Sequence, residues 1–258
     1  MKILAIGDIV GRIGRDRTMY FLDKHKDEYD LIIANGENAA HGNGMTTSVY
    51  KELVGYGIDG FTMGNHTWGA PDIVNLMRYN NNIIRPANFD RDCPGKGSMI
   101  LKAKNGVSVG VINLIGRVYM PLPFDSPFAA VERELKFLKP KTDIILVDFH
   151  AEATSEKKAM GYFLDGKVSA VFGTHTHVQT ADESILPGKT GYITDLGMTG
   201  AVHSVLGMNK NIIVNRFLNG MPQKFELATG EGVFCGCAFT IDESSGKTVS
   251  IERIYEKQ

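Results

Sequence analysis

Five apolar runs of the chain each end at or near a carboxylate, amide or imidazole side chain, and this repeated pattern constrains the fold more than any other feature. Runs of this length, rich in β-branched and aromatic residues, predict buried β-strands. The runs and their polar residues are 3–9 with Asp8, 29–34 with Glu37 and Asn38, 58–63 with Asn65 and His66, 143–149 with His150, and 169–173 with His175 and His177.

The first three of these strands alternate with segments of helical pattern. A helix is predicted from Gly11 to about His25, and a second from Thr46 or Thr47 to Val54. The order strand, helix, strand, helix, strand favours a parallel sheet, and ligands collect at the carboxyl ends of the strands in such sheets. We therefore expect the polar residues of the five strands to meet.

The rest of the chain predicts a second sheet and further helices. Met99–Leu101 and Val107–Leu114 flank Asn105-Gly106, a strong hairpin signal, so an antiparallel pair forms part of a second sheet or the edge of the first. Further helices are predicted at 71–77, 127–138, 154–164 and 209–218. Further extended segments are 83–88, 192–195 before a Gly-rich loop at 196–200, and a final hairpin of 233–241 with 249–251. The expected fold class is α/β, with two mixed sheets and helices outside them.

Composition limits the class of protein. With 258 residues and 43 % hydrophobic content, the chain is long enough to bury one large core, so we expect a single domain over residues 1–258. A net charge of −1 provides no basic field for duplex nucleic acid. The three cysteines (Cys93, Cys235 and Cys237) argue against a disulfide framework, and the apolar run before Asp8 is too short for a signal peptide or a membrane span. These features indicate a cytoplasmic protein with no membrane partner.

The polar residues at the strand ends have the chemistry of a metal site. A pair of divalent ions needs a carboxylate that can bridge, further oxygen ligands and several neutral imidazoles. Each residue alone has an ordinary alternative: Asp8 and Glu37 as helix caps, Asn65 in a turn, His150 at a helix start. Their joint occurrence at five strand ends favours a metal site.

Several strings of the sequence resemble a known family. Gly7-Asp8, Gly36-Glu37-Asn38, Gly64-Asn65-His66, His150 and 173–177 (Gly-Thr-His-Thr-His) resemble the successive signatures of the calcineurin-like metallophosphoesterases. The strings 7–12, 35–40 and 195–200 are similar to the YmdB subgroup, whose members hydrolyse 2′,3′-cyclic nucleotides. The resemblance covers essentially the whole chain and implies a four-layer α/β/β/α sandwich with two metal ions.

The resemblance also implies a ligand set. The usual Asp-x-His of the superfamily is Asp8-Ile9-Val10 here, and the usual bridging Asp is Glu37. The amide of Asn38 would then replace the absent imidazole. One ion is expected on Asp8, Glu37, Asn38 and His177, and the other on Glu37, Asn65, His150 and His175. Such mixed ligands suit divalent or mixed-valence ions, with iron favoured and manganese or zinc as alternatives.

The expected reaction is hydrolysis of a small phosphodiester, most specifically a 2′,3′-cyclic nucleotide. Two ions about 3.5–4 Å apart would activate a bridging hydroxide. His66, which follows a ligand, is the expected general acid for the leaving oxygen, and a structural role is its alternative. The rival functions are a phosphomonoesterase or nucleotidase with the same metals, and a regulatory or RNA-associated binding protein with a structural metal site.

Weaker signals leave their roles open. His41 and His203 lie in predicted loops, and Arg12 and Arg15 open a helix where phosphate could bind. Trp68 and its neighbour Thr67 follow His66 without an acidic residue, so the sequence does not show what orients His66. It also leaves open whether the chain forms a homo-oligomer.

Overall fold

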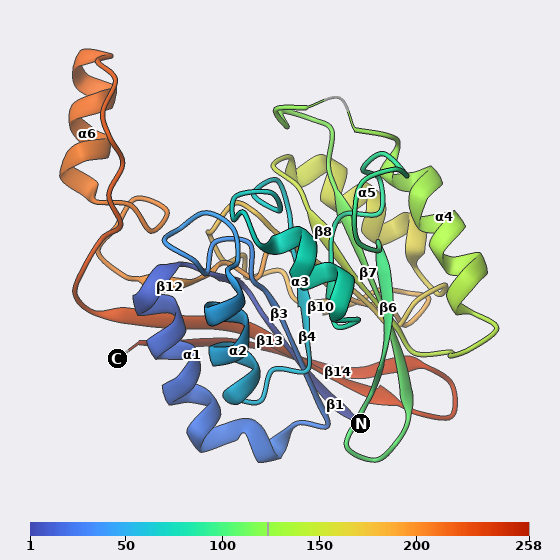
Figure 1. The fold of residues 1–258 in the computed structure, drawn as a ribbon. Helices are drawn as coiled ribbons and strands as arrows, with labels where there is room; N and C mark the ends of the chain where they lie inside the picture. Colours follow the sequence, from blue (N-terminus) through green and yellow to red (C-terminus); the bar gives the residue numbers. More distant parts are fainter. Residues whose placement is uncertain (123, 258) are drawn as a thin grey trace.

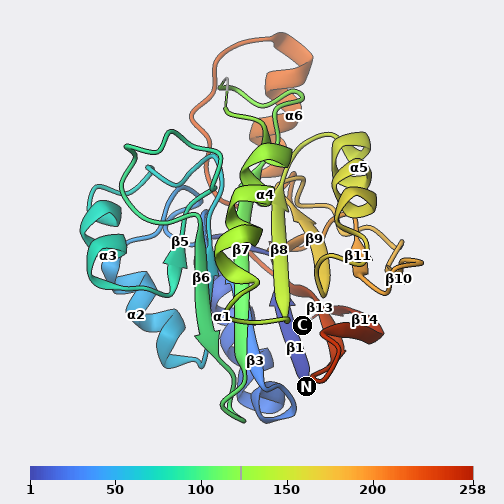
Figure 2. The same cartoon turned by 90° about the vertical axis from the view of Figure 1, so that its right-hand side faces the viewer.

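The computed structural model describes residues 1–122 and 124–257, which form four layers (Figure 1). Helices α1 (Gly11–His25), α2 (Thr47–Gly55) and α3 (Ile73–Tyr79) cover the outer face of one sheet. Helices α4 (Pro127–Leu138) and α5 (Thr154–Leu164) cover the outer face of the other, as Figure 2 shows. The predicted α/β/β/α sandwich with two mixed sheets is confirmed.

The first sheet has eight strands within the described residues, in the order β2-β12-β13-β1-β3-β4-β5, with β14 paired to β13. Its strands are β1 (Lys2–Ile6), β2 (Asp8–Ile9), β3 (Leu31–Asn35), β4 (Gly60–Thr62), β5 (Ile83–Ile84), β12 (Met198–Ala201), β13 (Gly232–Asp242) and β14 (Lys247–Lys257). The strands β1, β3, β4 and β5 are parallel, as the alternation with helices predicts. Because β13 lies antiparallel to β1, the sheet is mixed.

The second sheet has the order β10-β11-β9-β8-β7-β6 in the part of the chain that the structure describes. Its strands are β6 (Ser98–Lys102), β7 (Ser108–Ile115), β8 (Ile145–His150), β9 (Ala170–Thr174), β10 (Ser184–Ile185) and β11 (Gly191–Ile193). The predicted hairpin is confirmed as the antiparallel pair β6 and β7, and it forms an edge of this second sheet.

Successive side chains of a strand point to opposite faces of its sheet, and this alternation divides the core into three apolar layers. On β1, Leu4 and Ile6 pack among the side chains of α1 and α2, whereas Ile3 and Ala5 face the second sheet. On β8, Ile145, Val147 and Phe149 face α4 and α5. The alternate residues Leu146, Asp148 and His150 therefore point toward the first sheet, which places His150 at the end of the layer between the sheets.

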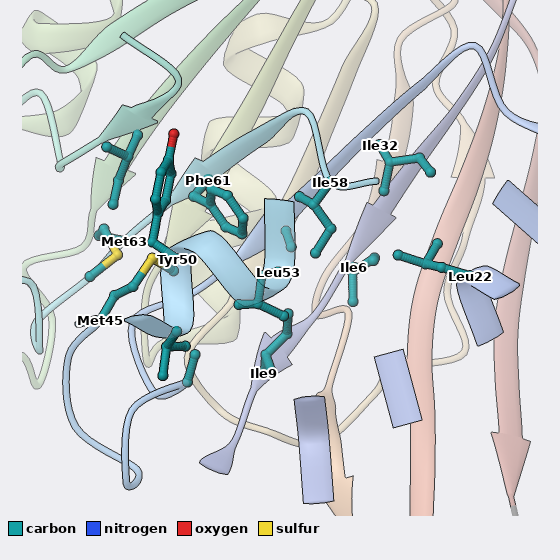
Figure 3. Packing of buried hydrophobic residues seen from close by; sticks show 14 of the residues in the cluster. Ile6, Ile9, Leu22, Ile32, Met45, Tyr50, Leu53, Ile58, Phe61 and Met63 are labelled. Carbon is teal, nitrogen blue, oxygen red and sulfur yellow. The ribbon is translucent and has the colours of Figure 1, made fainter. Parts of the chain in front are cut away.

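The layer under α2 shows how the helices are held (Figure 3). Leu53 of α2 and Phe61 of β4 are fully buried, and the ring of Tyr50 lies 5.6 Å from that of Phe61 between centroids. Burial of each such apolar side chain contributes about 1.5–3 kcal/mol to folding. Met45 and Met63, from the loops that follow β3 and β4, are buried in the same layer, so this packing also holds those loops.

Some predicted boundaries were wrong. The expected strand 3–9 is split at Gly7, and residues 198–201, expected within and just after a Gly-rich loop, form strand β12. The reason is tertiary: β12 pairs with β2 on one side and with β13 on the other, and these partners are distant in sequence. The strand expected at 249–251 extends over all of β14. Of residues 83–88, expected as a strand or an extended loop, only β5 is a strand, and it ends before Pro86.

Helix α6 (Lys210–Asn219) and its flanking segments project from the body of the molecule (Figure 1). Of the residues in this helix, Ile213 is buried, while Phe217 and Leu218 are largely exposed. None of the described helices is both long and apolar enough to cross a membrane. Cys93, Cys235 and Cys237 all lie in the described part of the chain and form no disulfide.

Candidate metal centre

The polar residues of the five strand ends meet between the two sheets. Asp8, Glu37 and Asn65 follow β1, β3 and β4 of the first sheet. His150 and His175 lie at the ends of β8 and β9 in the second sheet. The convergence expected from the sequence is thus present in the structure, and each sheet contributes part of the site.

Four of these side chains form a compact group around His150. The Nε2 atom of His150 lies 3.1 Å from Glu37 Oε1, 2.9 Å from Asn65 Oδ1 and 3.1 Å from His175 Nδ1. The potential ligand atoms of Glu37, His150 and His175 all lie within 4.8 Å of one another. One carboxylate, one amide oxygen and two imidazoles are a donor set that fits a divalent transition-metal ion.

A second group consists of Asp8, Asn38 and His177, and the Asn38 amide nitrogen lies 3.3 Å from Glu37 Oε1. Asp8 is fully buried, and its Oδ1 atom has no hydrogen-bond partner among the described residues. This oxygen lies 3.9 Å from His177 Nε2, which is 3.2 Å from the amide nitrogen of Asn38. A buried carboxylate oxygen without a partner is costly unless a cation balances it, so the geometry of this group also fits a metal ion.

The electrostatics of the cluster favour a cation. Burial alone would raise the pKa of Glu37, but the charge of His150 and hydrogen bonds from His150 and from the backbone of His66 lower it to about 2. For His150, burial lowers the pKa, but the carboxylates of Glu37, Asp8 and Asp148 raise it to about 9. Burial raises the pKa of Asp8. The anionic groups therefore create a negative potential at the imidazole nitrogen that faces the site.

The two histidines of the His-Thr-His segment reach the site through unusual backbone conformations. His175 and His177 have φ angles of 97° and 64°, a region that non-glycine residues seldom adopt. Thr176 between them is held by Asp195, whose Oδ2 accepts from the Thr176 N–H at 3.2 Å and from its hydroxyl at 2.8 Å. The same oxygen accepts from Lys157 Nζ at 2.6 Å, so a buried ion pair anchors the segment.

Close packing explains the glycine that precedes Asn65. A β-carbon at Gly64 would collide with His150 Nε2 and with Glu37 Oε2. Only glycine leaves room for both side chains at this point, so Gly64 lets the end of β4 approach the cluster.

His66 lies beside Glu37 through its backbone. Its N–H donates to Glu37 Oε2 at 2.8 Å, and its side chain is partly exposed. The backbone of His66 is therefore held against the carboxylate of Glu37. Thr67, rather than an acidic residue, directly follows His66, and the backbone contact with Glu37 is what ties His66 to the cluster.

Sequence reasoning missed several residues that support the cluster. Asp148 is fully buried beneath it, Lys157 and Asp195 hold the His-Thr-His segment, and Glu152 Oε2 lies 3.1 Å from His175 Nε2. A signal for Asp148 was present: an acidic residue stands inside an apolar strand, two positions before His150 and so on the same face.

The weaker candidates have local partners. Arg15 donates to both carboxylate oxygens of Glu52 and to the carbonyl of Ala39, which favours a structural role over phosphate binding. Arg12 is exposed, with Nε 3.6 Å from Asp16 Oδ2. His203 is also exposed, with Nε2 3.7 Å from Glu231 Oε2. His41 is an exposed loop residue with a φ of 56°.

Comparisons with known proteins agree with the fold and the family resemblance. The family model described as YmdB-like protein matches residues 4–254. The chain is 48 % identical over 256 residues to the 2′,3′-cyclic-nucleotide 2′-phosphodiesterase of Bacillus subtilis (strain 168), covering 98 % of this chain and 96 % of that protein.

Two solved structures superpose on nearly the whole molecule. A hypothetical protein of Thermus thermophilus matches with a TM-score of 0.94 and 40 % identity, covering 100 % of both chains. A novel phosphatase of Mycoplasma pneumoniae matches with a TM-score of 0.93 and 34 % identity, covering 100 % of this chain and 93 % of that one.

Proposed function

This chain belongs to the YmdB-like family of metallophosphoesterases, and from that premise we propose that it is a metal-dependent phosphodiesterase that hydrolyses 2′,3′-cyclic nucleotides. The observation that carries the proposal is the convergence of Glu37, His150 and His175 at the carboxyl ends of strands from both sheets. The full-length similarity to a protein named as a 2′,3′-cyclic-nucleotide 2′-phosphodiesterase supports the substrate class.

Two metal ions are proposed, with Glu37 shared between them. Asp8, Asn38 and His177 complete the ligands of one ion, while Asn65, His150 and His175 complete those of the other. Two observations support this division. Asp8 Oδ1 has no hydrogen-bond partner among the described residues, and the potential ligand atoms of Glu37, Asn65 and His175 lie around His150 Nε2. Carboxylate, amide and imidazole ligands together suit iron, with manganese and zinc as alternatives.

The ligand residues are held in place before any substrate binds. When bound, two metal ions would supply hydroxide from water near neutral pH and offset the negative charge of the phosphate. The chain itself holds Glu37: Oε2 accepts from the His66 N–H at 2.8 Å, and Oε1 lies 3.1 Å from His150 Nε2. Such restraint lowers the reorganisation needed during the reaction.

His66 is proposed as the general acid. In hydrolysis of a 2′,3′-cyclic phosphodiester, hydroxide forms a new bond to phosphorus and one ring P–O bond breaks. The leaving ribose oxygen takes a proton, and the product is a nucleoside monophosphate. Two observations support this role: the backbone N–H of His66 contacts Glu37, and the side chain is partly exposed.

A phosphomonoesterase is the second candidate, because the Mycoplasma pneumoniae structure is described as a phosphatase. The same ligands would serve either ester, since attack at phosphorus needs the same charge compensation. The substrate, rather than the metal site, separates the two functions.

The proposal extends to the compartment and to partners. Three cysteines without disulfides support a cytoplasmic location. The net charge of −1 supports a small phosphodiester as substrate rather than duplex nucleic acid.

The test compares two substrates in one preparation. Metal content is measured in the protein as purified, and the protein is then incubated with 2′,3′-cyclic AMP or with 3′-AMP, before and after chelation. The proposal expects bound metal, turnover of the cyclic diester and loss of turnover on chelation. Faster release of phosphate from 3′-AMP than opening of the cyclic diester would favour the phosphomonoesterase.

A further inference from the structure

Asp148 is a buried carboxylate directly beneath the candidate metal centre, and the mechanism above gives it no role. Its side chain is fully buried. Its Oδ1 accepts from the hydroxyl of Thr174 at 2.7 Å, and its Oδ2 accepts from the hydroxyl of Thr62 and from the amide nitrogen of Asn35, the latter at 3.3 Å. A buried charge is kept only with such partners, so its position is specified by all three.

The hydrogen bonds of Thr174 have a defined direction. An ionised carboxylate only accepts, so the single hydroxyl proton of Thr174 is donated to Asp148. The Nδ1 atom of His150 lies 2.9 Å from the same hydroxyl oxygen. Because that oxygen has no proton left, it can only accept from Nδ1, and Nδ1 of His150 must carry hydrogen.

Two further atoms lie near His150 Nδ1, both farther away than the Thr174 oxygen. Asp8 Oδ1, an acceptor, lies 3.9 Å away. The amide nitrogen of Asn35 lies 3.5 Å from Nδ1 and is itself a donor. The orientation of this amide is set because Asn35 Oδ1 accepts from the N–H of Glu37 at 3.1 Å. This 3.5 Å contact is longer than the 2.9 Å contact with Thr174, and the same amide nitrogen also lies 3.3 Å from Asp148 Oδ2 and 3.5 Å from Thr174 Oγ1. The Thr174 oxygen is therefore the group that decides the hydrogen on Nδ1.

We propose that Asp148 is a positioning residue that acts through Thr174 to hold His150 as the Nδ1–H tautomer, with the lone pair of Nε2 presented to the metal. This inference rests on the proposed function for its purpose. The Nε2 atom faces Glu37 Oε1 and Asn65 Oδ1, both acceptors, which is where a cation would lie. Groups that orient a metal-binding histidine in this way raise metal affinity.

Thr174 also links Asp148 and His150 to the His-Thr-His segment. It is the last residue of β9 and directly precedes His175, whose Nδ1 lies 3.1 Å from His150 Nε2. Loss of the Thr174 hydroxyl would thus release the tautomer of one ligand without removing any ligand.

The first experiment detects the hydrogen on His150 Nδ1 in the metal-free protein. Nitrogen-15 and proton NMR of labelled histidines observes this hydrogen directly, whether or not Nε2 also carries one, and its exchange rate with solvent reports the hydrogen bond to Thr174. A slowly exchanging Nδ1–H is expected for His150 in the wild-type protein and in Thr174→Ser, which keeps the hydroxyl. Faster exchange is expected in Thr174→Val and in Asp148→Asn. A wild-type His150 without hydrogen on Nδ1, or unchanged exchange in both variants, would overturn the proposal.

The second experiment measures Mn²⁺ affinity by competition with a chelator. Thr174→Val and Asp148→Asn should weaken one of the two Mn²⁺ sites by about 10-fold to 100-fold, while Thr174→Ser stays close to wild type. The double variant should be no weaker than the weaker single variant, because both residues act through one path. Unchanged affinity in both single variants would overturn the proposal.

The two experiments separate this inference from the proposed function. Wild-type protein that binds no Mn²⁺ would refute the proposed metal centre, whereas the Nδ1 hydrogen of His150 in the metal-free protein tests the contact with Thr174 and Asp148 in either case. Unfolding is measured for each variant. If Thr174→Val does not fold, Asp148→Asn carries the test, since it retains shape and volume.

Discussion

The two halves of the candidate centre differ in how completely the chain has arranged them. The His150 half consists of Glu37, Asn65, His150 and His175. Three of its potential ligand atoms lie within 3.1 Å of His150 Nε2. In the His177 half, formed by Asp8, Asn38 and His177 with the shared Glu37, Asp8 Oδ1 is 3.9 Å from His177 Nε2. The potential ligand atoms of the first half are therefore packed more closely than those of Asp8 and His177 in the second.

The supports of the two halves explain this difference. His150 is fully buried and backed by Thr174 and Asp148. His177 is partly exposed, and its Nδ1 lies 3.1 Å from the carbonyl of Leu206, an exposed loop residue. A ligand held by a loop adapts more easily but binds less tightly, because ordering it lowers the free energy gained on binding. We therefore expect the His150 half to hold its ion more tightly.

The largest expected effect is on the residue that joins the halves. Glu37→Ala should remove both ions and reduce phosphodiesterase activity to background, because each half loses its shared carboxylate. Metal analysis of the purified variant measures the first effect, and turnover of 2′,3′-cyclic AMP the second. Glu231→Ala is the control, since Glu231 is an exposed acid beside His203. A Glu37→Ala protein that keeps one ion at full occupancy would show that the halves do not share Glu37.

The next effect separates the halves. His150→Ala should deplete the ion of the His150 half, and His177→Ala the ion of the other, so each variant keeps one ion. The ion left in His177→Ala should resist chelation better than the ion left in His150→Ala, since the His150 half is the more completely assembled. Anomalous scattering locates the ion that stays. If the ion left in His150→Ala resisted chelation better than the ion left in His177→Ala, the His177 half would be the one that holds its ion more tightly.

A smaller effect is expected where neither half loses an ion. His66→Ala keeps the backbone N–H that donates to Glu37 Oε2, so both ions should stay bound. Turnover of an ester with a poor leaving group should fall by roughly 10² to 10⁴, the range for general acid catalysis. A nitrophenyl phosphodiester should lose much less, because its leaving group departs without a proton. Equal losses for both esters at full metal occupancy would mean that His66 orients substrate instead.

Much of the fold could be predicted because its signals are local. The apolar runs of β3 and β8, the turn at Asn105-Gly106 and the helical pattern of α4 each depend on neighbouring residues. Strand β12 was missed because two of its four residues, Thr199 and Gly200, have little in common with a buried run, and its partners β2 and β13 are far away in sequence. Such short strands form through tertiary pairing rather than intrinsic preference.

The same limit applies to the site. Asp8, Glu37 and His150 could be found because they lie at strand ends, where ligands collect in a parallel sheet. The supports of the site could not be assigned from the pattern, because Lys157 on α5 meets Asp195 only through the fold. Only Asp148 carried a readable signal, an acid on the same face of a buried strand as His150.

The smallest effect concerns Asn38, which tests how the His177 half closes. Its backbone carbonyl accepts from the N–H groups of Gly11 and Gly42 at 3.0 and 3.1 Å, and these bonds survive any change of side chain. The amide nitrogen, rather than the oxygen, faces His177 Nε2 and Glu37 Oε1, and rotation of the amide by half a turn would exchange the two atoms. Asn38→Ala should weaken the ion of the His177 half by about 10-fold to 100-fold and leave the other unchanged.

Asn38→Asp distinguishes the two orientations of that amide. Aspartate keeps an oxygen ligand but cannot donate, so affinity for the ion of the His177 half should match or exceed wild type if Asn38 coordinates through oxygen. If the amide instead acts as a donor to Glu37, the new carboxylate would face another carboxylate, and like charges at that distance repel. Chelator competition with Mn²⁺ measures both variants. Weaker binding in Asn38→Asp than in Asn38→Ala would remove Asn38 from the ligand set and leave the His177 half with Asp8, Glu37 and His177 alone.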